Sequence, residues 1–263
     1  MRNRLIAVAI CLCATTLLLA VPAQAQNNTN IGEFSVNLWM PTPEITIRSG
    51  ALTGATGGTV TDIDFVTEFG IEDKSFPEFR FVVGRSHKLR FGYVPIKYEA
   101  DAVIQRRITF RGQTFNVGVP ASTEIKWDLW RFGYEWDFVS MDKGYFGVVA
   151  ELKYNKMQAS IASPALTSTA STEQNAPVPT IGVAARGYVH PMVFIGGEFT
   201  GLKLTRDDFE AKFFDFDFNA GVTFGGHVGV QGGYRSVTVN YVIDDDSGDL
   251  VFKGPYVGGH VKS

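Results

Sequence analysis

Beyond residue 25 the sequence contains no cysteine, because Cys11 and Cys13 both lie in its first apolar segment. A mature chain that begins after this segment can form neither a disulfide nor a thiolate metal site. No later stretch reaches the roughly 18 uncharged apolar residues that a membrane-spanning helix needs. The sequence also has no basic block that would contact phosphates, so nucleic acid is excluded as a partner.

The first 25 residues have the pattern of a secretory signal peptide. Arg2 and Arg4 precede an apolar run that ends at Val21, and Ala23-Gln24-Ala25 follows as a small-x-small cleavage site. A transmembrane anchor is the alternative, whereas lipidation is disfavoured because Ile10 and Leu12, rather than small residues, precede the cysteines. We therefore predict a cleaved signal at 1–25 and one mature domain at 26–263, with 22 basic and 27 acidic residues and a net charge of −5.

The rest of the chain is built from segments in which apolar and polar residues alternate. The clearest is 214–224, where four phenylalanines, Ala220 and Val222 share one parity and Asp215, Asp217 and Asn219 share the other. Because alternate residues of a strand point to opposite faces, this pattern predicts a strand with one apolar and one polar face. Segments 130–138, 145–154, 181–189 and 193–201 repeat the pattern, and no helical periodicity persists beyond a few residues.

Short and long connections separate these segments. Tight turns are expected at 84–87, 140–144, 190–191 and 225–227, and longer polar or Gly/Thr-rich loops at about 49–76, 106–120, 163–178, 205–211 and 244–249. Their alternation predicts ten strands, with eight as the main rival count. The ten are expected near 33–48, 77–84, 88–105, 121–139, 144–162, 178–189, 192–204, 211–224, 227–243 and 250–261.

A signal peptide, dyad alternation and alternating short and long connections are together typical of one class of protein. Across essentially its whole mature length the chain resembles a small Gram-negative outer-membrane β-barrel protein. The resemblance implies an all-β fold, a closed antiparallel transmembrane β-barrel located in the bacterial outer membrane. It also implies membrane lipid and the barrel-assembly machinery as partners, and short turns on the periplasmic rim.

In such a barrel the apolar face contacts lipid and the polar face lines the lumen. Aromatic side chains are expected to form a lipid-facing girdle: Trp127, Trp130, Trp136, Phe138 and Tyr154. Over the nine residues from Trp127 to Trp136 a strand would cover roughly 23 Å of membrane, close to the ~25 Å apolar band.

The predicted lumen carries seven side chains of each sign. The basic ones are Arg80, Arg90, Arg131, Lys153, Arg186, Arg235 and Lys253, and the acidic ones are Glu78, Glu135, Asp137, Glu151, Glu198, Asp215 and Asp217. Balanced charges in a ten-stranded barrel, which is close to the size that side chains can fill, favour a network of paired charges over a lined pore.

These features favour a non-enzymatic outer-membrane protein with a structural or interaction role. A narrow channel for small solutes is the first alternative, and a lipid-modifying enzyme or protease is the second. His87, His190, His227 and His260 all fall on the turn side, far from the acids of the outer loops, so no catalytic site, metal or cofactor is expected. In loop 49–76, strand extensions are favoured over a plug containing a short helix near Ile63, Val66 and Phe69.

Overall fold

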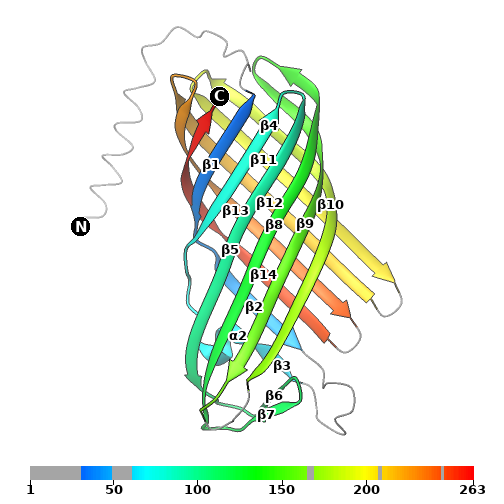
Figure 1. The fold of residues 1–263 in the computed structure, drawn as a ribbon. Coiled ribbons are helices and arrows are strands. Elements are labelled where there is room, and N and C mark those ends of the chain that lie inside the picture. The colour runs from blue at the N-terminus through cyan, green and yellow to red at the C-terminus, as the bar shows by residue number, and fades with distance from the viewer. Residues whose placement is uncertain (1–30, 49–60, 165–168, 207–208, 244–245) are drawn as a thin grey trace, which may run out of the picture.

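The fold was analysed in a computed structural model that describes residues 31–48, 61–164, 169–206, 209–243 and 246–263. The predicted signal peptide lies outside these residues. Strands wind round a closed, elongated barrel whose C-terminus lies at the end marked by the short turns (Figure 1). The strands of the wall are β1 (Gly32–Trp39), β2 (Thr42–Arg48), β4 (Phe76–Gly84), β5 (His87–Val103), β8 (Pro120–Met141), β9 (Gly144–Ala162), β10 (Ala170–His190), β11 (Val193–Arg206), β12 (Phe209–Phe224), β13 (Val228–Ile243) and β14 (Asp246–Lys262).

The wall is a closed antiparallel sheet of ten strands, as the sequence predicts. β1 and β2 form one strand interrupted at Met40 and Pro41, and both pair with β14. Each remaining wall strand pairs with its neighbour in the chain, and β1 closes the ring by pairing with β4 and β14. Closure leaves no free edge in this part of the sheet, which is the requirement for strands that cross a bilayer.

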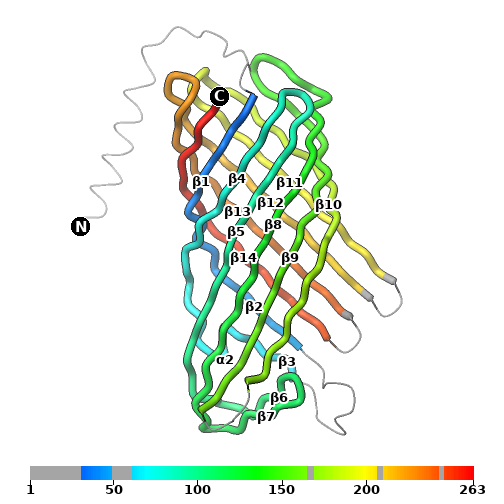
Figure 2. Tube along the Cα trace, in the orientation of Figure 1, coloured from blue at the N-terminus to red at the C-terminus, as the bar shows by residue number. Residues whose placement is uncertain are grey.

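All four tight turns lie at one end of the barrel, where the chain also begins β1 and ends β14 (Figure 2). The long connections lie at the opposite end, but three of them are shorter than expected. β10 already begins at Ala170, β12 at Phe209 and β14 at Asp246. The sequence pattern predicts loops for these polar segments, one of which contains Pro177. They instead continue the strands beyond the membrane, because both faces of a strand tolerate polar side chains there.

The polarity of the two faces reverses along the wall strands. On β8 the outward residues are apolar from Phe138 back to Trp130 and charged at Lys126 and Glu124, while the inward residues change from charged Arg131 to apolar positions. β5 and β9 change in the same way. We call the part of the barrel on the turn side of this reversal the membrane half and the part on the loop side the outer half. The 22 residues of β8 extend roughly 55 Å along the normal at a tilt of ~40°, about twice the apolar band.

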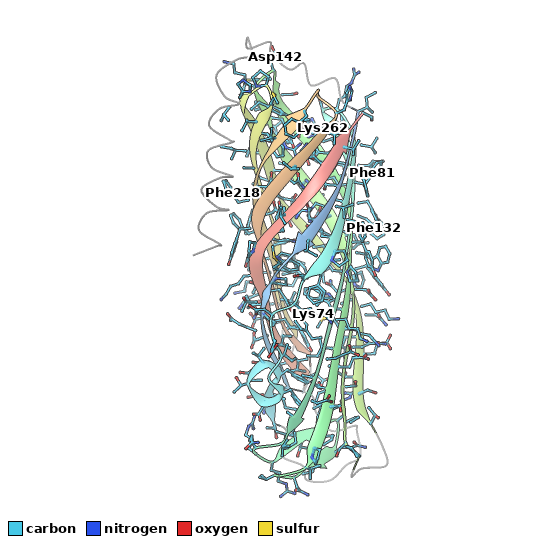
Figure 3. All side chains as sticks on the ribbon, turned by 90° about the vertical axis from the view of Figure 1, so that its left-hand side faces the viewer. Lys74, Phe81, Phe132, Asp142, Phe218 and Lys262 are labelled. Atoms are coloured by element: carbon cyan, nitrogen blue, oxygen red, sulfur yellow. The ribbon has the colours of Figure 1, made fainter. Side chains whose placement is uncertain are left out.

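Aromatic side chains cover the outside of the membrane half. Phe81, Phe132 and Phe218 point away from the wall (Figure 3). Trp136, Phe138 and Tyr154 are 39–49% exposed, and Trp130 is half-buried against the ring of Tyr93. These four predicted girdle residues therefore face outward. From Trp130 to Phe138 the strand rises roughly 20 Å along the normal.

The prediction that Trp127 faces lipid is wrong. Its side chain is 1% exposed, packs against Phe252 and donates a hydrogen bond from Nε1 to Oδ1 of Asn155 at 3.0 Å. The reason is parity: Trp127 and Trp136 are nine positions apart, an odd difference, so a regular strand places them on opposite faces. Trp130, of the same parity as Trp136, occupies the outer aromatic position.

In the outer half the wall opens on one side, between β10 and β11. β10 pairs with β9 from Ala170 onward, whereas its pairing with β11 begins only at Ile181. Pro177 and Pro179 precede this point, and neither can donate a backbone hydrogen bond to a neighbouring strand. The ladder to β9 continues past both prolines while the ladder to β11 stops, so the prolines explain where the two strands part.

The outer half is filled by an apolar core and a plug. The plug consists of β3 (Asp62–Asp64), helix α2 (Phe65–Phe69), and the hairpin of β6 (Ile108–Phe110) and β7 (Gln113–Phe115). Asp64 caps the helix by accepting hydrogen bonds from the backbone of Val66 and Thr67. Phe65 and Phe110 are fully buried, and their rings contact each other and the core of the barrel.

Loop 49–76 therefore combines the two conformations that the sequence left open. β3 extends the sheet by pairing with β2, while the helix turns inward; the preference for strand extensions alone was wrong. Residues 49–60 of this loop lie outside the described part of the chain. Among the described residues, no helix is long and apolar enough to cross a membrane.

Candidate functional site

The lumen of the membrane half contains a layer of ionised side chains that we call the charge layer. It has eight basic and eight acidic members, so its formal charge is balanced, and no side chain in it is more than 19% exposed. The members are Arg80, Lys88, Arg90, Arg131, Lys153, Arg186, Arg235, Lys262, Glu33, Glu78, Glu135, Asp137, Glu151, Glu198, Asp215 and Asp217. Each forms at least one ion pair, as burial of charge requires.

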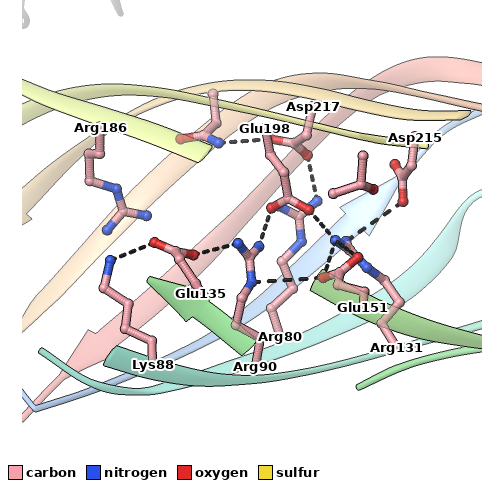
Figure 4. Close-up of polar contacts among 12 residues, drawn as sticks. Arg80, Lys88, Arg90, Arg131, Glu135, Glu151, Arg186, Glu198, Asp215 and Asp217 are labelled. Carbon is pink, nitrogen blue, oxygen red and sulfur yellow. Dashed lines mark hydrogen bonds and ion pairs between the residues drawn. The ribbon is translucent and has the colours of Figure 1, made fainter. Parts of the chain in front are cut away.

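One branch of the charge layer links two arginines and a lysine across the lumen (Figure 4). Glu198 bridges Arg90 and Arg131, although these residues belong to β11, β5 and β8. Arg131 also donates to Glu151 at 2.9 Å. Lys88 binds Glu135 at 2.7 Å. The branch ties one side of the barrel to the other, so its pairs stabilise the closed cross-section as well as each strand.

A second branch is centred on Asp215. Arg235 donates to its two oxygens from Nε at 3.0 Å and from Nη2 at 2.9 Å, and Lys153 binds it at 2.6 Å. Arg235 also pairs with Glu78, which Arg80 binds at 2.8 Å. Arg235 and Lys153 have no exposed side-chain surface. These charges are therefore removed from water and depend on their partners.

Cation–π contacts join the charge layer to the apolar core of the outer half. The guanidinium carbon of Arg235 lies 5.2 Å from the ring centroid of Trp39, and the ammonium of Lys153 lies 5.0 Å from that of Phe213. Both rings are almost fully buried in the core. The lumen thus passes from ionised side chains directly to packed aromatic side chains, with these two contacts at the junction.

Of the fourteen predicted luminal side chains, the structure brings together these eleven: Arg80, Arg131, Glu135, Asp137, Glu151, Lys153, Arg186, Glu198, Asp215, Asp217 and Arg235. Arg90 and Glu78 also lie in the charge layer. Lys253 does not: its side chain is 44% exposed and pairs outside the barrel with Glu44. It lies beyond the polarity reversal, where charged residues face outward.

Sequence reasoning missed Glu33, Lys88 and Lys262. Glu33 is the partner of Arg186, which holds it through Nη1 at 2.5 Å and Nη2 at 3.1 Å. Lys262 lies 3.6 Å from the same carboxylate. All three lie within two residues of a strand end at the turn rim. The only available signal was their parity with inward residues such as Ser35, Arg90 and His260.

A polar cavity of about 110 Å³ lies between the charge layer and the turn rim. It is bounded at the rim by Ile31 and Gly84. Deeper in, five cationic and three anionic side chains of the charge layer line it: Arg80, Lys88, Arg90, Arg186, Lys262, Glu33, Glu135 and Glu198. Because none of its lining residues belongs to the apolar core, the cavity ends within the membrane half.

The histidines have structural partners. His260 is buried and its Nε2 lies 2.9 Å from the hydroxyl of Thr223, while Nδ1 of His190 accepts a hydrogen bond from the backbone of Met192. Nδ1 of His227 donates to the carbonyl of Lys262 at 3.2 Å, and His87 stacks on Trp136. All four lie at the turn end, as predicted.

Acidic residues of the outer half also form local pairs. Asp246 pairs with Arg111 of the plug hairpin turn at 3.4 Å. On the outer surface Glu124 lies between Lys126 at 2.6 Å and Lys97 at 3.0 Å, and hydrogen bonds from these ammonium groups lower its pKa to about 2. Asp207, Asp208, Asp244 and Asp245 lie outside the described residues.

Comparison with known proteins agrees with the architecture. No family model and no curated protein matches the chain. Among solved structures, the outer membrane protease OmpT of Escherichia coli matches with a TM-score of 0.57 at 10% identity, over 93% of this chain and 99% of that one. Ail of Yersinia pestis, solved with the heparin analogue sucrose octasulfate, gives 0.38 at 8% identity, over 89% and 99%. The toluene transporter TodX of Pseudomonas putida gives 0.35 at 8% identity, over 94% and 93%. The likeness to OmpT concerns the fold alone, and together with the closed sheet it shows that the chain is a ten-stranded antiparallel β-barrel of the outer-membrane kind.

Proposed function

We propose that this protein is a non-conducting, non-enzymatic barrel of the bacterial outer membrane with a structural or interaction role. The observation that carries the proposal is the filling of the lumen. Arg235 and Lys153, in the middle of the charge layer, have no exposed side-chain surface, whereas a water-filled channel would hydrate its inward charges. The fold, the apolar outer surface of the membrane half and the predicted signal peptide support this location.

The outer half supports a role in interaction. Its wall rises well beyond the apolar band, and its own core and plug hold it in shape in the absence of surrounding lipid. Its outer surface carries exposed pairs of opposite charge, such as Lys97 with Glu124, in place of aromatic side chains. A rigid, polar platform outside the membrane is suited to contact with other molecules at the cell surface.

The arrangement of residues disfavours both alternatives. OmpT is a protease, but a likeness in fold does not carry a catalytic site from one chain to another. Here the histidines lie at the turn rim, across the height of the barrel from the outer acids. A narrow channel for small solutes would have to cross both the charge layer and the apolar core.

Single-channel recording in planar lipid bilayers tests the proposal. The mature protein, refolded in detergent and shown by heat-modifiable gel migration to be closed, should give no steady conductance in 1 M KCl. A variant with the plug residue Phe65 changed to Ala should remain silent, because the charge layer lies below the plug. Stable, reproducible conductance steps from the unmodified protein would refute the filled lumen and favour the channel.

A further inference from the structure

We propose that the polar cavity at the turn rim binds one small oxyanion that enters from the periplasmic side. This goes beyond the proposed function, because such a site does not require passage through the barrel. The cavity is lined by members of the charge layer from β1, β4, β5, β8, β10, β11 and β14, so the assembled barrel, rather than any one strand, would create it.

Charge is the first reason for an anionic ligand. Five cationic and three anionic side chains line the cavity. Asp137, which binds Lys88 at 2.6 Å, stands behind this lysine and is not part of the lining. Glu78 and Asp217, the partners of Arg80, also lie outside the lining. The lining itself therefore carries two more positive than negative side chains, although the charge layer as a whole is balanced. A buried excess of this sign favours an anion.

The most weakly paired cation of the lining lies at the rim. Among the described residues, Glu33 is the only ionic partner of Lys262, at 3.6 Å, and it is already held by two nitrogens of Arg186. Lys88 lies 3.3 Å from the ring centroid of Tyr145, which is the direct neighbour of Arg186 across the β9–β10 ladder. Figure 4 shows the head groups of Arg186 and Lys88 pointing toward one another, and both line the cavity.

Unpartnered polar atoms are the second, independent reason. Nε of Arg80 and Oδ1 of Asn219 are buried, line the cavity through their residues and have no hydrogen-bond partner within the described chain. Buried donors and acceptors are almost always satisfied in proteins, by ordered molecules if not by protein groups. A protonated oxyanion offers an acceptor to the arginine and a donor to the amide oxygen.

The size of the cavity limits the ligand. A volume of about 110 Å³ corresponds to about three to four water molecules at the ~30 Å³ that each occupies in the liquid. This space accommodates one tetrahedral oxyanion and excludes sugars or nucleotides. Because short turns face the periplasm in barrels of this kind, the ligand would come from there.

Calorimetric titration with inorganic phosphate tests the site. The refolded barrel in a maltoside detergent, which carries no phosphate, is titrated at constant ionic strength, with chloride as the reference. Wild-type protein should give a saturable heat at one site per chain. Lys262→Met should weaken binding about tenfold or more, because a charge-assisted hydrogen bond is lost. Lys253→Met removes an exposed lysine of the same strand and should leave the affinity unchanged.

A spectroscopic measurement on the unmodified protein guards against misfolding of the variant. Phosphate should shift the side-chain NMR signals of Lys262 and Tyr145 and leave those of Lys253 in place. The proposal would be overturned by a heat that does not saturate, by equal affinity in wild type and Lys262→Met, or by shifts that follow ionic strength alone. Any of these outcomes would mean that the cavity does not bind phosphate specifically, and none of them would affect the prediction of zero conductance.

Discussion

Replacement of Arg235 by methionine should destabilise the barrel strongly. Arg235 is fully buried, binds Asp215 through two nitrogens, pairs with Glu78 and stacks on Trp39. Methionine keeps most of the volume but removes the charge, so two buried carboxylates lose a partner. Breaking a buried ion pair from one side typically costs ~3–5 kcal/mol. Lys153 and Arg80 still neutralise the two acids in part, so we expect about 3 kcal/mol.

A matched control lies almost beside this position. Lys253 precedes Gly254, the direct partner of Arg235 across the β13–β14 ladder, but its side chain is on the outside and pairs with exposed Glu44. Lys253→Met should change the free energy of unfolding by no more than about 0–1 kcal/mol. Urea unfolding in lipid vesicles, followed by tryptophan fluorescence, measures both variants, and heat-modifiable migration confirms that each is folded first.

A double variant decides whether the loss comes from charge rather than packing. Adding Glu78→Gln to Arg235→Met removes one charge of each sign, while Asp217 still pairs with Arg80 at 2.6 Å. The double variant should therefore be more stable than the sum of the two single losses predicts, by roughly 1–3 kcal/mol. If Arg235→Met were within about 1 kcal/mol of wild type and altered the current through bilayers, the charges would be hydrated and the filled lumen would be refuted.

Three other changes test separate parts of the structure. Val148→Arg places a charge on the lipid face and should cost about 2–4 kcal/mol, whereas Lys156→Ala, on the same face of β9 but in the outer half, should stay within ±0.5 kcal/mol in the same unfolding assay. Phe65→Ala removes a fully buried ring from the plug and should lower its local stability by ~3–5 kcal/mol. Amide exchange should become faster in residues 61–71 and stay unchanged in the membrane half. Exchange in 61–71 at the wild-type rate would show that the plug does not depend on this ring. Replacing Pro177 and Pro179 by threonine supplies two backbone hydrogen-bond donors and should extend the pairing of β10 with β11. Amide exchange in residues 202–205 should then become slower. Unchanged exchange would mean that the strands part for another reason.

The membrane half could be predicted largely from the sequence, because burial in lipid and burial in the lumen impose opposite polarities on alternate residues. Phe214 to Phe218 on β12 show this directly: their phenylalanines face outward, and Asp215 and Asp217 join the charge layer. Parity identified the inward charges, but it did not identify their partners. Arg186 pairs with Glu33, a residue far away in the chain that barrel closure brings within reach.

The outer half was harder to predict because its rules differ from those of the membrane half. There the inward face is apolar and the outward face is charged, so Trp127 and Lys253 were both assigned to the wrong side. Pro177 fell in the predicted loop 163–178, although a strand whose second neighbour has parted from it tolerates proline. The plug depends on long-range packing of Phe65 against Phe110, which no local pattern specifies.

The reversal of polarity along continuous strands has a consequence for how the protein is held together. Each half is stable for a reason that fails in the other: paired charges need the closed wall around them, and the apolar core needs a polar outer surface. β8 contributes to both, with Arg131 in the charge layer and Trp127 in the core only four residues away. Because the same strands run through both halves, loss of the charge layer would also weaken the wall of the outer half. The charge layer therefore stabilises the outer half through Arg235 and Lys153, whose cationic groups contact Trp39 and Phe213 of the apolar core.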